Sequence, residues 1–476
     1  MKSRVRTYGL ALALTCLLHA MGMAQDQPEV TPEDAQVLKE SYVTIRDVHI
    51  SGEQVTRLYI ITREVQFEKG HSYSMSEVLA RMKASKENLM NTALFVDVSV
   101  NFTKWMDDSL DIEVDVKERW YLFPLPYFKP IDRNWNVWIN QYKVSLDRVN
   151  YGLKFLANNL TGRNDRLNLW LINGYTRQVT LSYYTPYLDK ALRQGLGFDL
   201  TFAQNREINY TTRDNKQAFF KDGSKYIRDR FGFTITYSYR KGSKERHYAR
   251  VGYNIETIAD TVAVLNPKYF NNGATKVAYP EFSYRYEYYD VNYIPYPSKG
   301  QTWEFNFMKR GPSKNIDLWY FNARYARYWK LPHKFYFNFL AEATLKLPFD
   351  QPFYNQQLLG YSDSYLRGLE YYVIDGVAGG FLRNTLRKEV LSFKWNTGLR
   401  SRIYNQIPFK IYLKGFSDVG YVYNKNNVTG NMLTNKFMYT GGFGLDIVTI
   451  YDLVVRLEYS FNQLGEHALF YHLRDN

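Results

Sequence analysis

Alternation of large apolar and polar residues, repeated over segments of about ten residues, most constrains how this chain can fold. Within residues 231–240, every second side chain is large and apolar: Phe231, Phe233, Ile235, Tyr237 and Tyr239. Within residues 453–462, apolar side chains alternate mainly with Arg456, Glu458, Ser460 and Asn462. Successive side chains of a β-strand point to opposite faces of its sheet. Each segment therefore predicts a strand with one apolar face and one polar face.

Similar segments recur along most of the chain, separated by turns rich in Gly, Asn, Asp and Pro. They include residues 151–158, 166–175, 179–186, 197–205, 334–347 and 437–448. From residue 134 to the end there are roughly sixteen segments, an even number typical of bacterial outer-membrane barrels. A barrel in lipid must leave no backbone edge without partners. We therefore expect the first strand, near residues 134–144, to pair with the last, near residues 466–473.

So many apolar strand faces are most simply explained by a barrel whose outer surface contacts lipid. Aromatic residues make up 17% of the chain, with 43 Tyr, 30 Phe and 9 Trp, and membrane barrels carry aromatic girdles at both interfaces. Mean hydropathy is −0.44, which suits a barrel because only alternate residues face lipid. Beyond residues 1–24 there is no apolar run of about 18 residues, the length of a transmembrane helix. Composition alone leaves a soluble all-β protein as the alternative.

The N-terminus predicts export from the cytoplasm. Residues 1–24 combine a basic start, an apolar run at residues 10–18 and a small-residue cleavage site at residues 22–24, the pattern of a secretory signal peptide. Residues 25–41 are expected to be a leader. The single cysteine, Cys16, lies inside the apolar run, so the mature chain would carry no disulfide. Cleavage removes three basic and no acidic residues, which lowers the net charge from +14 to +11.

The region before the barrel has a different pattern. Strands are predicted at residues 42–50, 95–102 and 110–117, and helices at residues 56–65 and 74–90. We expect one small α+β domain at residues 42–119, followed by the barrel domain at residues 120–476. The short leader leaves room for only one such domain before the barrel.

Several motifs resemble those of a known family in order and spacing. In the N-terminal domain, the resemblance is to a POTRA domain and lies in residues 48–52 (Val-His-Ile-Ser-Gly), 60–70, 89–98 and 114–119. In the barrel, the motifs are residues 159–162 (Asn-Leu-Thr-Gly), 185–187 (Thr-Pro-Tyr), 297–300 (Pro-Ser-Lys-Gly), 366–369 (Leu-Arg-Gly-Leu) and 416–420 (Phe-Ser-Asp-Val-Gly). Together they resemble the BamA/TamA outer-membrane assembly factor (bacterial surface antigen) superfamily, in a short form with a single POTRA domain. The resemblance covers nearly the whole mature chain, and it implies a barrel in the bacterial outer membrane with the POTRA domain in the periplasm.

Three features depart from the family pattern. Leu366 and Leu369 replace the Val/Ile and aromatic residues that usually flank the Arg-Gly pair of the loop motif. The assembly factor of the family carries several POTRA domains, whereas one is expected here. The C-terminus, residues 470–476, lacks the terminal aromatic residue usual for outer-membrane barrels. Recognition of the chain by its own assembly machinery is therefore expected to use Phe470 or Tyr471.

A charged pair is the candidate site. Within residues 410–420, Asp418 falls on the face opposite to the apolar residues, so we expect its carboxylate to face the lumen. Arg367 belongs to a long loop, residues 350–375, and its planar guanidinium would meet this carboxylate through two hydrogen bonds. Such a pair would hold the loop inside the barrel as a structural latch, and it would not be a catalytic dyad.

The resemblance extends this latch to further residues. It implies a second carboxylate acceptor for Arg367 at Glu389. The candidate site residues are therefore Arg367, Gly368, Asp418, Gly420 and Glu389. The alternative is that Arg367 is one solvated charge on a surface loop.

The resemblance also implies how such a protein works. In this superfamily the first and last barrel strands pair weakly, and a client strand can add to the exposed edge. The implied partners are unfolded outer-membrane or surface-protein clients, outer-membrane lipids or lipopolysaccharide, and other subunits of an assembly machinery. Three functions stay open: an insertase for a subset of barrels or surface proteins, a two-partner-type secretion pore, and a passive porin or structural barrel.

The sequence gives little support for an enzyme. The six histidines beyond residue 24 are scattered without metal-ligand spacing, and there is no Gly-x-Ser-x-Gly or Walker-type motif. His467 and His472 are five residues apart on one strand, hence on opposite faces, and make a poor metal pair. We expect no cofactor, no metal and no nucleic-acid partner, because export of the chain makes anionic lipid head groups the nearer match for its basic charge.

Overall fold

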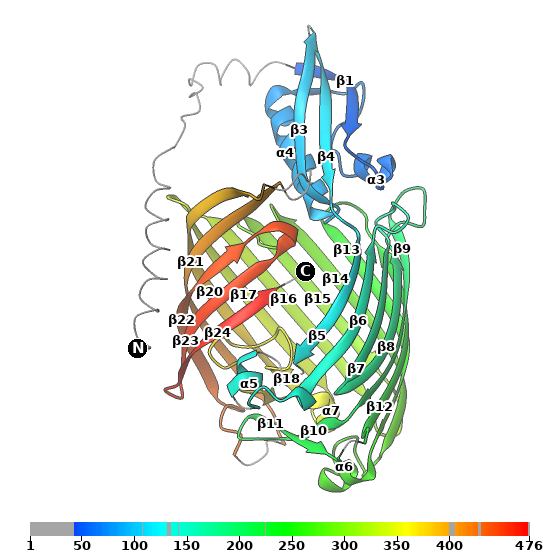
Figure 1. Ribbon diagram of the computed structural model, residues 1–476, viewed down its shortest axis with the longest axis vertical. Helices are drawn as coiled ribbons and strands as arrows, with labels where there is room; N and C mark the ends of the chain where they lie inside the picture. Colours follow the sequence, from blue (N-terminus) through cyan, green and yellow to red (C-terminus); the bar gives the residue numbers. More distant parts are fainter. Residues whose placement is uncertain are drawn as a thin grey trace.

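The computed structural model describes residues 42–106, 108–130, 135–140, 142–223, 225–398, 405–426 and 430–474, and it shows a small α+β unit mounted on one end of a β-barrel (Figure 1). The predicted signal peptide, residues 1–24, and leader, residues 25–41, lie outside the described residues. In the part of the chain that is described, no helix has the length and hydropathy needed to cross a bilayer.

The α+β unit contains the five elements that the sequence predicts and one short strand more. Its elements are β1 (Tyr42–Ser51), α3 (Leu58–Thr62), β2 (Ser72–Ser74), α4 (Met75–Asn91), β3 (Phe95–Met106) and β4 (Ser109–Glu118). The sheet has the order β2-β1-β4-β3, with β1 parallel to β4. Helix α4 begins at a capping box in which Ser74 and Glu77 satisfy each other's backbone N–H groups. Apolar side chains between helix and sheet, such as Leu89 and Phe95, are fully buried.

The barrel is a single antiparallel sheet of sixteen strands, which confirms the predicted fold class. The strands are β5 (Leu122–Pro130), β6 (Val149–Asn158), β7 (Arg166–Gly174), β8 (Thr176–Thr185), β9 (Gln194–Asn205), β12 (Arg228–Tyr239), β13 (Glu245–Ile258), β14 (Lys276–Val291), β15 (Gly300–Arg310), β16 (Leu318–Lys330), β17 (Phe335–Leu347), β20 (Ala378–Asn396), β21 (Gln406–Tyr423), β22 (Phe437–Val448), β23 (Val454–Asn462) and β24 (His467–Arg474). Neighbours in this order pair with each other, and β5 and β24 are the two ends of the sheet.

Smaller elements lie in the connections between barrel strands. They are α5 (Trp135–Asn140), η2 (Leu146–Arg148), β10 (Glu207–Arg213), β11 (Lys216–Lys221), α6 (Asp260–Leu265), α7 (Phe353–Gln356), β18 (Gln357–Leu359), β19 (Ile374–Asp375) and η3 (Ile450–Asp452). Strands β10 and β11 and helix α6 lie at the end of the barrel opposite the α+β unit (Figure 1).

The alternation in the sequence becomes an outer and an inner barrel face. On β12, the side chains of Phe231, Phe233 and Ile235 are exposed on the outside, whereas Thr236 and Ser238 are buried. On β23, Glu458 and Ser460 are buried while Phe461 is exposed. Apolar residues thus form the outer surface and polar residues fill the interior, as in a barrel surrounded by lipid.

The predicted position of the first strand is wrong. Residues 135–140 form helix α5. The first strand is β5, which the sequence pattern did not predict. The reason is proline: Pro124, Pro126 and Pro130 all lie in β5, and proline argues against a strand except at a sheet edge. The last strand, β24, lies within one residue of its predicted bounds.

Candidate functional site

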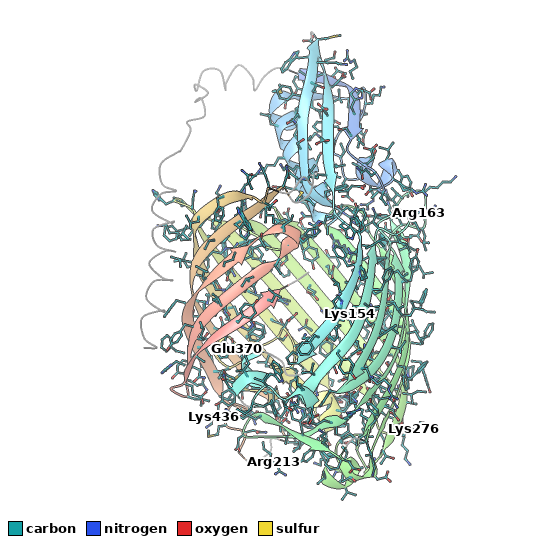
Figure 2. The ribbon with its side chains drawn as sticks, viewed as in Figure 1. Lys154, Arg163, Arg213, Lys276, Glu370 and Lys436 are labelled. Atoms are coloured by element: carbon teal, nitrogen blue, oxygen red, sulfur yellow. The ribbon has the colours of Figure 1, made fainter. Side chains whose placement is uncertain are left out.

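The connection between β17 and β20 folds into the interior of the barrel. Leu366 and Leu369 are 1% and 2% exposed. They belong to an apolar cluster with Phe381 of β20, Val422 of β21 and Met438 of β22. Figure 2 places Glu370, which follows in the same loop, within the outline of the barrel. Both leucines that depart from the family motif therefore contribute to the packing of the loop against the barrel wall.

Arg367 contacts Asp418 through both the side chain and the backbone. The Arg367 Nε donates to Asp418 Oδ2 at 2.9 Å, the backbone N–H donates to the same oxygen at 3.0 Å, and Nη2 donates to Oδ1. Nη1 donates to Thr385 Oγ1 at 2.9 Å, and the guanidinium lies 4.1 Å from the centre of the Phe416 ring. Asp418 is fully buried. The structure thus brings together the two charged residues that the sequence places in one site.

A second arginine, from the neighbouring strand β20, also lies beside Asp418. Asp418 lies on β21 opposite Arg383 of β20, and Arg383 Nε is 3.6 Å from Asp418 Oδ2. Arg383 also donates to the backbone carbonyl of Tyr365, two residues before Arg367 in the loop. Asp418 therefore lies between two guanidinium groups, one from the barrel wall and one from the loop.

Two glycines give the loop the space it occupies. Gly420 of β21 faces Leu366, and a Cβ at this position would lie 3.1 Å from Leu366 Cδ1 and 3.1 Å from the Gly380 carbonyl oxygen. Gly368 has φ of +91°, and its carbonyl oxygen accepts a hydrogen bond from Asn462 Nδ2 at 2.8 Å. A left-handed backbone favours glycine at position 368, and close approach of the loop favours it at position 420.

Glu389 is not the second acceptor that the resemblance implied. It lies on β20 opposite Tyr412, whose hydroxyl donates to Glu389 Oε2 at 3.3 Å, and Lys334 Nζ is 3.7 Å from Oε1. Glu389 lies four residues beyond Thr385, the β20 residue whose side chain contacts Arg367. At about 3.3 Å per strand residue, this separation puts Glu389 out of reach of the Arg367 guanidinium. The remaining hydrogen bonds of Arg367 go to Thr385 and to the Asn384 carbonyl.

A second group of charges continues from this pair toward the end of the sheet. Lys414 of β21 bonds to Asp446 of β22 and to Glu458 of β23, with 2.6 Å between Lys414 Nζ and Glu458 Oε1. Tyr296 donates to Asp446 Oδ2 at 2.7 Å from a turn between β14 and β15. These side chains are buried. Buried charges are tolerated when they are paired in this way.

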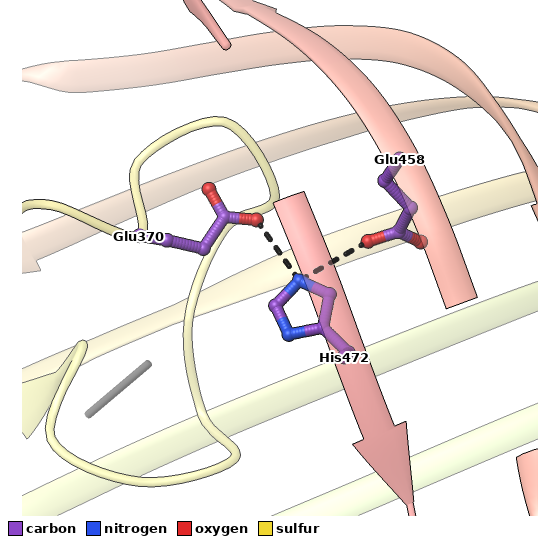
Figure 3. A group of neighbouring side chains, drawn as sticks. All are labelled: Glu370, Glu458 and His472. Carbon is purple, nitrogen blue, oxygen red and sulfur yellow. Dashed lines mark ion pairs between the residues drawn. The ribbon is translucent and has the colours of Figure 1, made fainter. Parts of the chain in front are cut away.

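The last strand is tied to the loop by a histidine. His472 Nε2 of β24 lies 3.5 Å from Glu370 Oε1 and 3.5 Å from Glu458 Oε2 (Figure 3). These three side chains are close enough together to hold a metal ion. Glu458 is already paired with Lys414, and Arg456 lines the same cavity as Glu458. These neighbouring positive charges disfavour a metal ion between the three side chains.

A cavity of about 690 Å³ lies between the α+β unit, the turns at that end of the barrel and the loop. Arg367, Arg383 and Lys414 line it. In all, nine basic and four acidic side chains face this space. The cavity is therefore positively charged, which favours anionic groups or the carbonyl oxygens of an extended chain.

Ion pairs fix the α+β unit to the barrel. Glu64 is 1% exposed and pairs with Arg63 at 2.6 Å and with Arg240, in the turn after β12, at 2.9 Å. Arg119 makes two hydrogen bonds to Asp452, at 2.9 and 3.2 Å. Since both carboxylates are buried and hydrogen-bonded to arginines, these contacts hold the unit against the end of the barrel.

Two of the motifs are the turns on which this unit rests. In residues 159–162, Gly162 lies so close to the unit that a Cβ would approach the Val55 carbonyl oxygen to 2.2 Å, and Asn159 Nδ2 donates to Thr56 Oγ1 at 2.9 Å. Tyr187, from the second motif, is buried in the apolar core of the unit. Burial also raises the pKa of Tyr121, in the linker, to about 12, and its hydroxyl donates to the Leu94 carbonyl at 3.0 Å.

Sequence reasoning found the loop pair but missed most of its surroundings. The contacts of Lys414, His472 and Glu64 join residues far apart in the chain, and no short sequence motif predicts them. The sequence does place charged residues, such as Asp446 and Glu458, at inward positions of neighbouring strands. Because buried charges need partners, this pattern could have predicted ion pairs inside the barrel.

Comparison with known proteins supports the family resemblance. A model of the Omp85 superfamily domain matches residues 159–453, and a POTRA model, described as a surface antigen variable number repeat, matches residues 43–119. The crystal structure of BamA from Haemophilus ducreyi lacking POTRA domains 1-3 is similar, with a TM-score of 0.51, 16% identity, and coverage of 91% of this chain and 84% of that chain. CdiB from Escherichia coli has a TM-score of 0.54 and 10% identity, over 94% of this chain and 79% of that chain. These structures share the fold, and no curated protein sequence matches the chain.

Proposed function

The chain belongs to the Omp85 superfamily, and from this premise we propose that it inserts polypeptides into the bacterial outer membrane or moves them across it. Family membership supports outer-membrane insertion or secretion as the general role. The observation that carries the proposal is the joint arrangement of a POTRA domain fixed to the barrel mouth and a sheet whose two ends, β5 and β24, have no ladder between them among the described residues. An open sheet edge is a template for another strand.

We place the POTRA domain in the periplasm and the opposite end of the barrel at the cell surface. In Figure 2, Arg163 lies at the end that carries the POTRA domain and Arg213 at the opposite end. A client would arrive from the POTRA end, where the positively charged cavity opens, and leave sideways between β5 and β24. Its partners would be unfolded outer-membrane or surface proteins, outer-membrane lipids, and other assembly subunits.

The pair of Arg367 and Asp418 would act in this scheme as a latch. It holds the loop against β21, and Glu370 of the same loop meets His472 of the last strand. The loop thus connects the wall strand β21 with the strand at the end of the sheet. A latch of this kind sets the position of β24, which is the strand that must move for lateral exit.

A two-partner-type secretion pore is the second candidate. For a pore the loop must leave the interior, because residues 366–369 pack against β20, β21 and β22. The same loop argues against a passive porin, since it occupies space through which solutes would pass.

Depletion of the protein in its native host, followed by quantification of the outer-membrane proteome, tests the proposed function. Loss of a defined set of barrels or surface proteins would support it and supply the clients. Accumulation of one secreted partner in the periplasm, with the barrels unchanged, would favour the secretion pore. An unchanged proteome with altered uptake of small solutes would contradict both and favour a porin.

A further inference from the structure

The cavity between the α+β unit and the loop has more basic groups than its own carboxylates pair. Nine basic and four acidic side chains line it. Five of the basic groups already face carboxylates: Arg119, Arg324, Arg367, Arg383 and Lys414. The other four have no ion pair with any residue that the structure describes, and we call them the unpaired arginines: Arg166, Arg246, Arg387 and Arg456.

The acidic residues of the cavity have other partners. Three of the four are in ion pairs described above: Asp446, Asp452 and Glu458. The fourth, Glu304, accepts a hydrogen bond from Asn306 at 3.0 Å and lies opposite Arg324 in the ladder between β15 and β16. Asp446 and Glu458 attract Arg456 only from beyond ion-pair distance. The excess positive charge of the cavity is therefore left for solvent ions or a bound molecule to neutralise.

Two of the unpaired arginines carry buried donors without acceptors. The Nε–H groups of Arg387 and Arg456 are shielded from solvent, and no residue in the described ranges accepts a hydrogen bond from either. Arg387 is 6% exposed, its Nη2 donates to the Pro297 carbonyl, and the centre of the Tyr296 ring lies 4.1 Å from its guanidinium. A buried donor without a partner is unfavourable, and hydrogen bonds between a guanidinium and a carboxylate are strong. A carboxylate that enters the cavity therefore meets donors that the folded chain does not use.

The unpaired arginines come from separate parts of the cavity wall. Arg166 lies on β7, Arg246 on β13, Arg387 on β20 and Arg456 on β23. In the order of the sheet, each of these strands is separated from the next by at least two others. A single phosphate group is bound by donors that converge on one point, whereas a chain with several carboxylates is bound by donors at spaced positions. The spacing therefore favours an extended molecule with several negative charges.

We propose that this cavity binds an acidic, extended segment of a polypeptide, whose carboxylates pair with the unpaired arginines. The inference rests on the proposed function for the origin of the segment, which would be a client that arrives from the POTRA end. It deepens that function by naming a substrate class: segments that carry several Asp or Glu residues. A basic segment would be repelled by the excess positive charge. Because salt screens attraction between charges, binding of an acidic segment should weaken as the salt concentration rises.

A binding experiment on the purified full chain tests the proposal without any client. The probes are two short capped peptides, one in which glutamate alternates with serine and one in which glutamine replaces every glutamate. Each is titrated calorimetrically into the protein in a non-ionic detergent. We expect the glutamate peptide to bind and the glutamine peptide not to bind under the same conditions. The affinity for the glutamate peptide should fall at least about tenfold between about 50 and about 500 mM salt.

Variants of the unpaired arginines assign the binding to the cavity. In Arg387→Gln, Arg456→Gln, the affinity for the glutamate peptide should fall at least about tenfold, because two charged donors are lost. Arg213→Gln is the matched control and should bind like the parent, since Arg213 is exposed at the opposite end of the barrel (Figure 2). If the double variant does not fold, Arg456→Gln alone gives the comparison, because the Arg456 side chain has no hydrogen bond or ion pair to lose within the described part of the chain.

Equal binding of the two peptides, or no binding of the glutamate peptide, would overturn the proposal. An equal loss of affinity in Arg213→Gln would also overturn it, since binding would then follow the overall charge of the protein and not the cavity. Inorganic pyrophosphate is titrated at matched ionic strength; if it binds more tightly than the glutamate peptide and this binding is lost in the double variant, the cavity is a site for phosphate groups and the peptide assignment is wrong.

The outcomes for the cavity and for the proposed function are separable. The titrations use no client and do not depend on the outer-membrane proteome, so a depletion experiment that favours a porin would leave the peptide-binding result standing. Conversely, absence of peptide binding would remove the acidic substrate class and leave insertion or secretion to be decided by depletion.

Discussion

Arg367 is a single residue that connects a loop to the wall of the barrel. Its guanidinium is buried with Asp418, and Arg383 lies 3.6 Å from the same carboxylate. In Arg367→Ala, Asp418 would keep only one cation, and we expect a loss of about 3 kcal/mol, the lower end of the range for breaking a buried ion pair. Unfolding in urea, followed by heat-modifiable gel mobility, measures the loss.

Two further variants make this prediction specific. The exposed Arg213 of β10 provides a matched control, and Arg213→Ala should stay within about 0.5 kcal/mol of the parent. The double variant Arg367→Met, Asp418→Leu removes both charges, so it should cost less than the sum of the single changes. Equal stability of Arg367→Ala and Arg213→Ala would contradict the latch.

Gly420 tests whether the loop depends on close approach to β21. A Cβ at this position would lie 3.1 Å from Leu366 Cδ1, so Gly420→Ala should push the loop outward and destabilise the protein by about 1–3 kcal/mol. Gly415, on the same strand, has space for a Cβ, with the nearest atom 4.0 Å away. Gly415→Ala should therefore lie within about 1 kcal/mol of the parent. The same urea experiment compares the two, and equal effects would argue against a tight fit at Gly420.

The sequence predicts the residues of this site only where a local rule applies. Alternation along β21 places Asp418 on the inner face, and the loop motif supplies Arg367, so the pair can be anticipated. Glu389 was placed by the resemblance alone, and it lies four residues beyond Thr385, the β20 residue that contacts Arg367. The role of His472 could not be predicted, because its contact with Glu370 joins the last strand to a loop about a hundred residues earlier in the chain. No periodicity of the sequence relates these two positions.

At the scale of elements, the alternating strands were predictable and the exceptions have physical causes. Strand β22 has its predicted bounds because large apolar residues stand at every second position from Phe437 to Ile447, with Gly441 as the exception. Strand β5 was hidden by prolines that only an edge strand tolerates. Strand β2 has three residues, too few for a periodic pattern. The way the POTRA domain docks on the barrel turns could not be predicted, since it depends on contacts between two domains.

The ion pair between POTRA and barrel leads to a prediction for these elements. Glu64 faces Arg63 and Arg240, and Glu64→Gln removes the charge while it keeps the shape. Hydrogen bonds to charged groups are worth about 1.5–3 kcal/mol, so local opening of the interface should become roughly tenfold more frequent. Hydrogen exchange at α3 and at residues 159–162 should then be faster.

Glu68→Gln serves as the control for the interface, because the Glu68 side chain is 75% exposed. It should leave exchange at α3 unchanged. If Glu64→Gln has no more effect than Glu68→Gln, the POTRA domain is held by its apolar contacts, such as those of Tyr187, and the ion pair contributes little.

At the scale of the whole molecule, two groups of charged contacts meet at the loop. Arg367 of the loop pairs with Asp418, and the group of Lys414, Asp446 and Glu458 reaches His472 of β24, which lies beside Glu370 of the same loop. The loop, the barrel wall and the last strand are therefore in contact through His472, which lies beside both Glu370 and Glu458. A change in the position of β24 must alter the contacts of Glu370 in the loop, so opening of the seam between β5 and β24 is expected to be coupled to movement of the loop.

A disulfide across the seam tests this coupling and the proposed function together. Cysteine pairs between β5 and β24, such as Phe128→Cys with Tyr471→Cys, would be screened for spontaneous oxidation, which requires Cα atoms about 4.4–6.8 Å apart. We expect a locked seam to reduce the outer-membrane proteins that depend on this chain, and reduction of the disulfide to restore them. The control is Leu457→Cys with Tyr471→Cys, which are register partners of β23 and β24 and leave the seam open. Because the control locks β24 to β23 alone, full activity of both variants would show that clients leave by a route other than the seam.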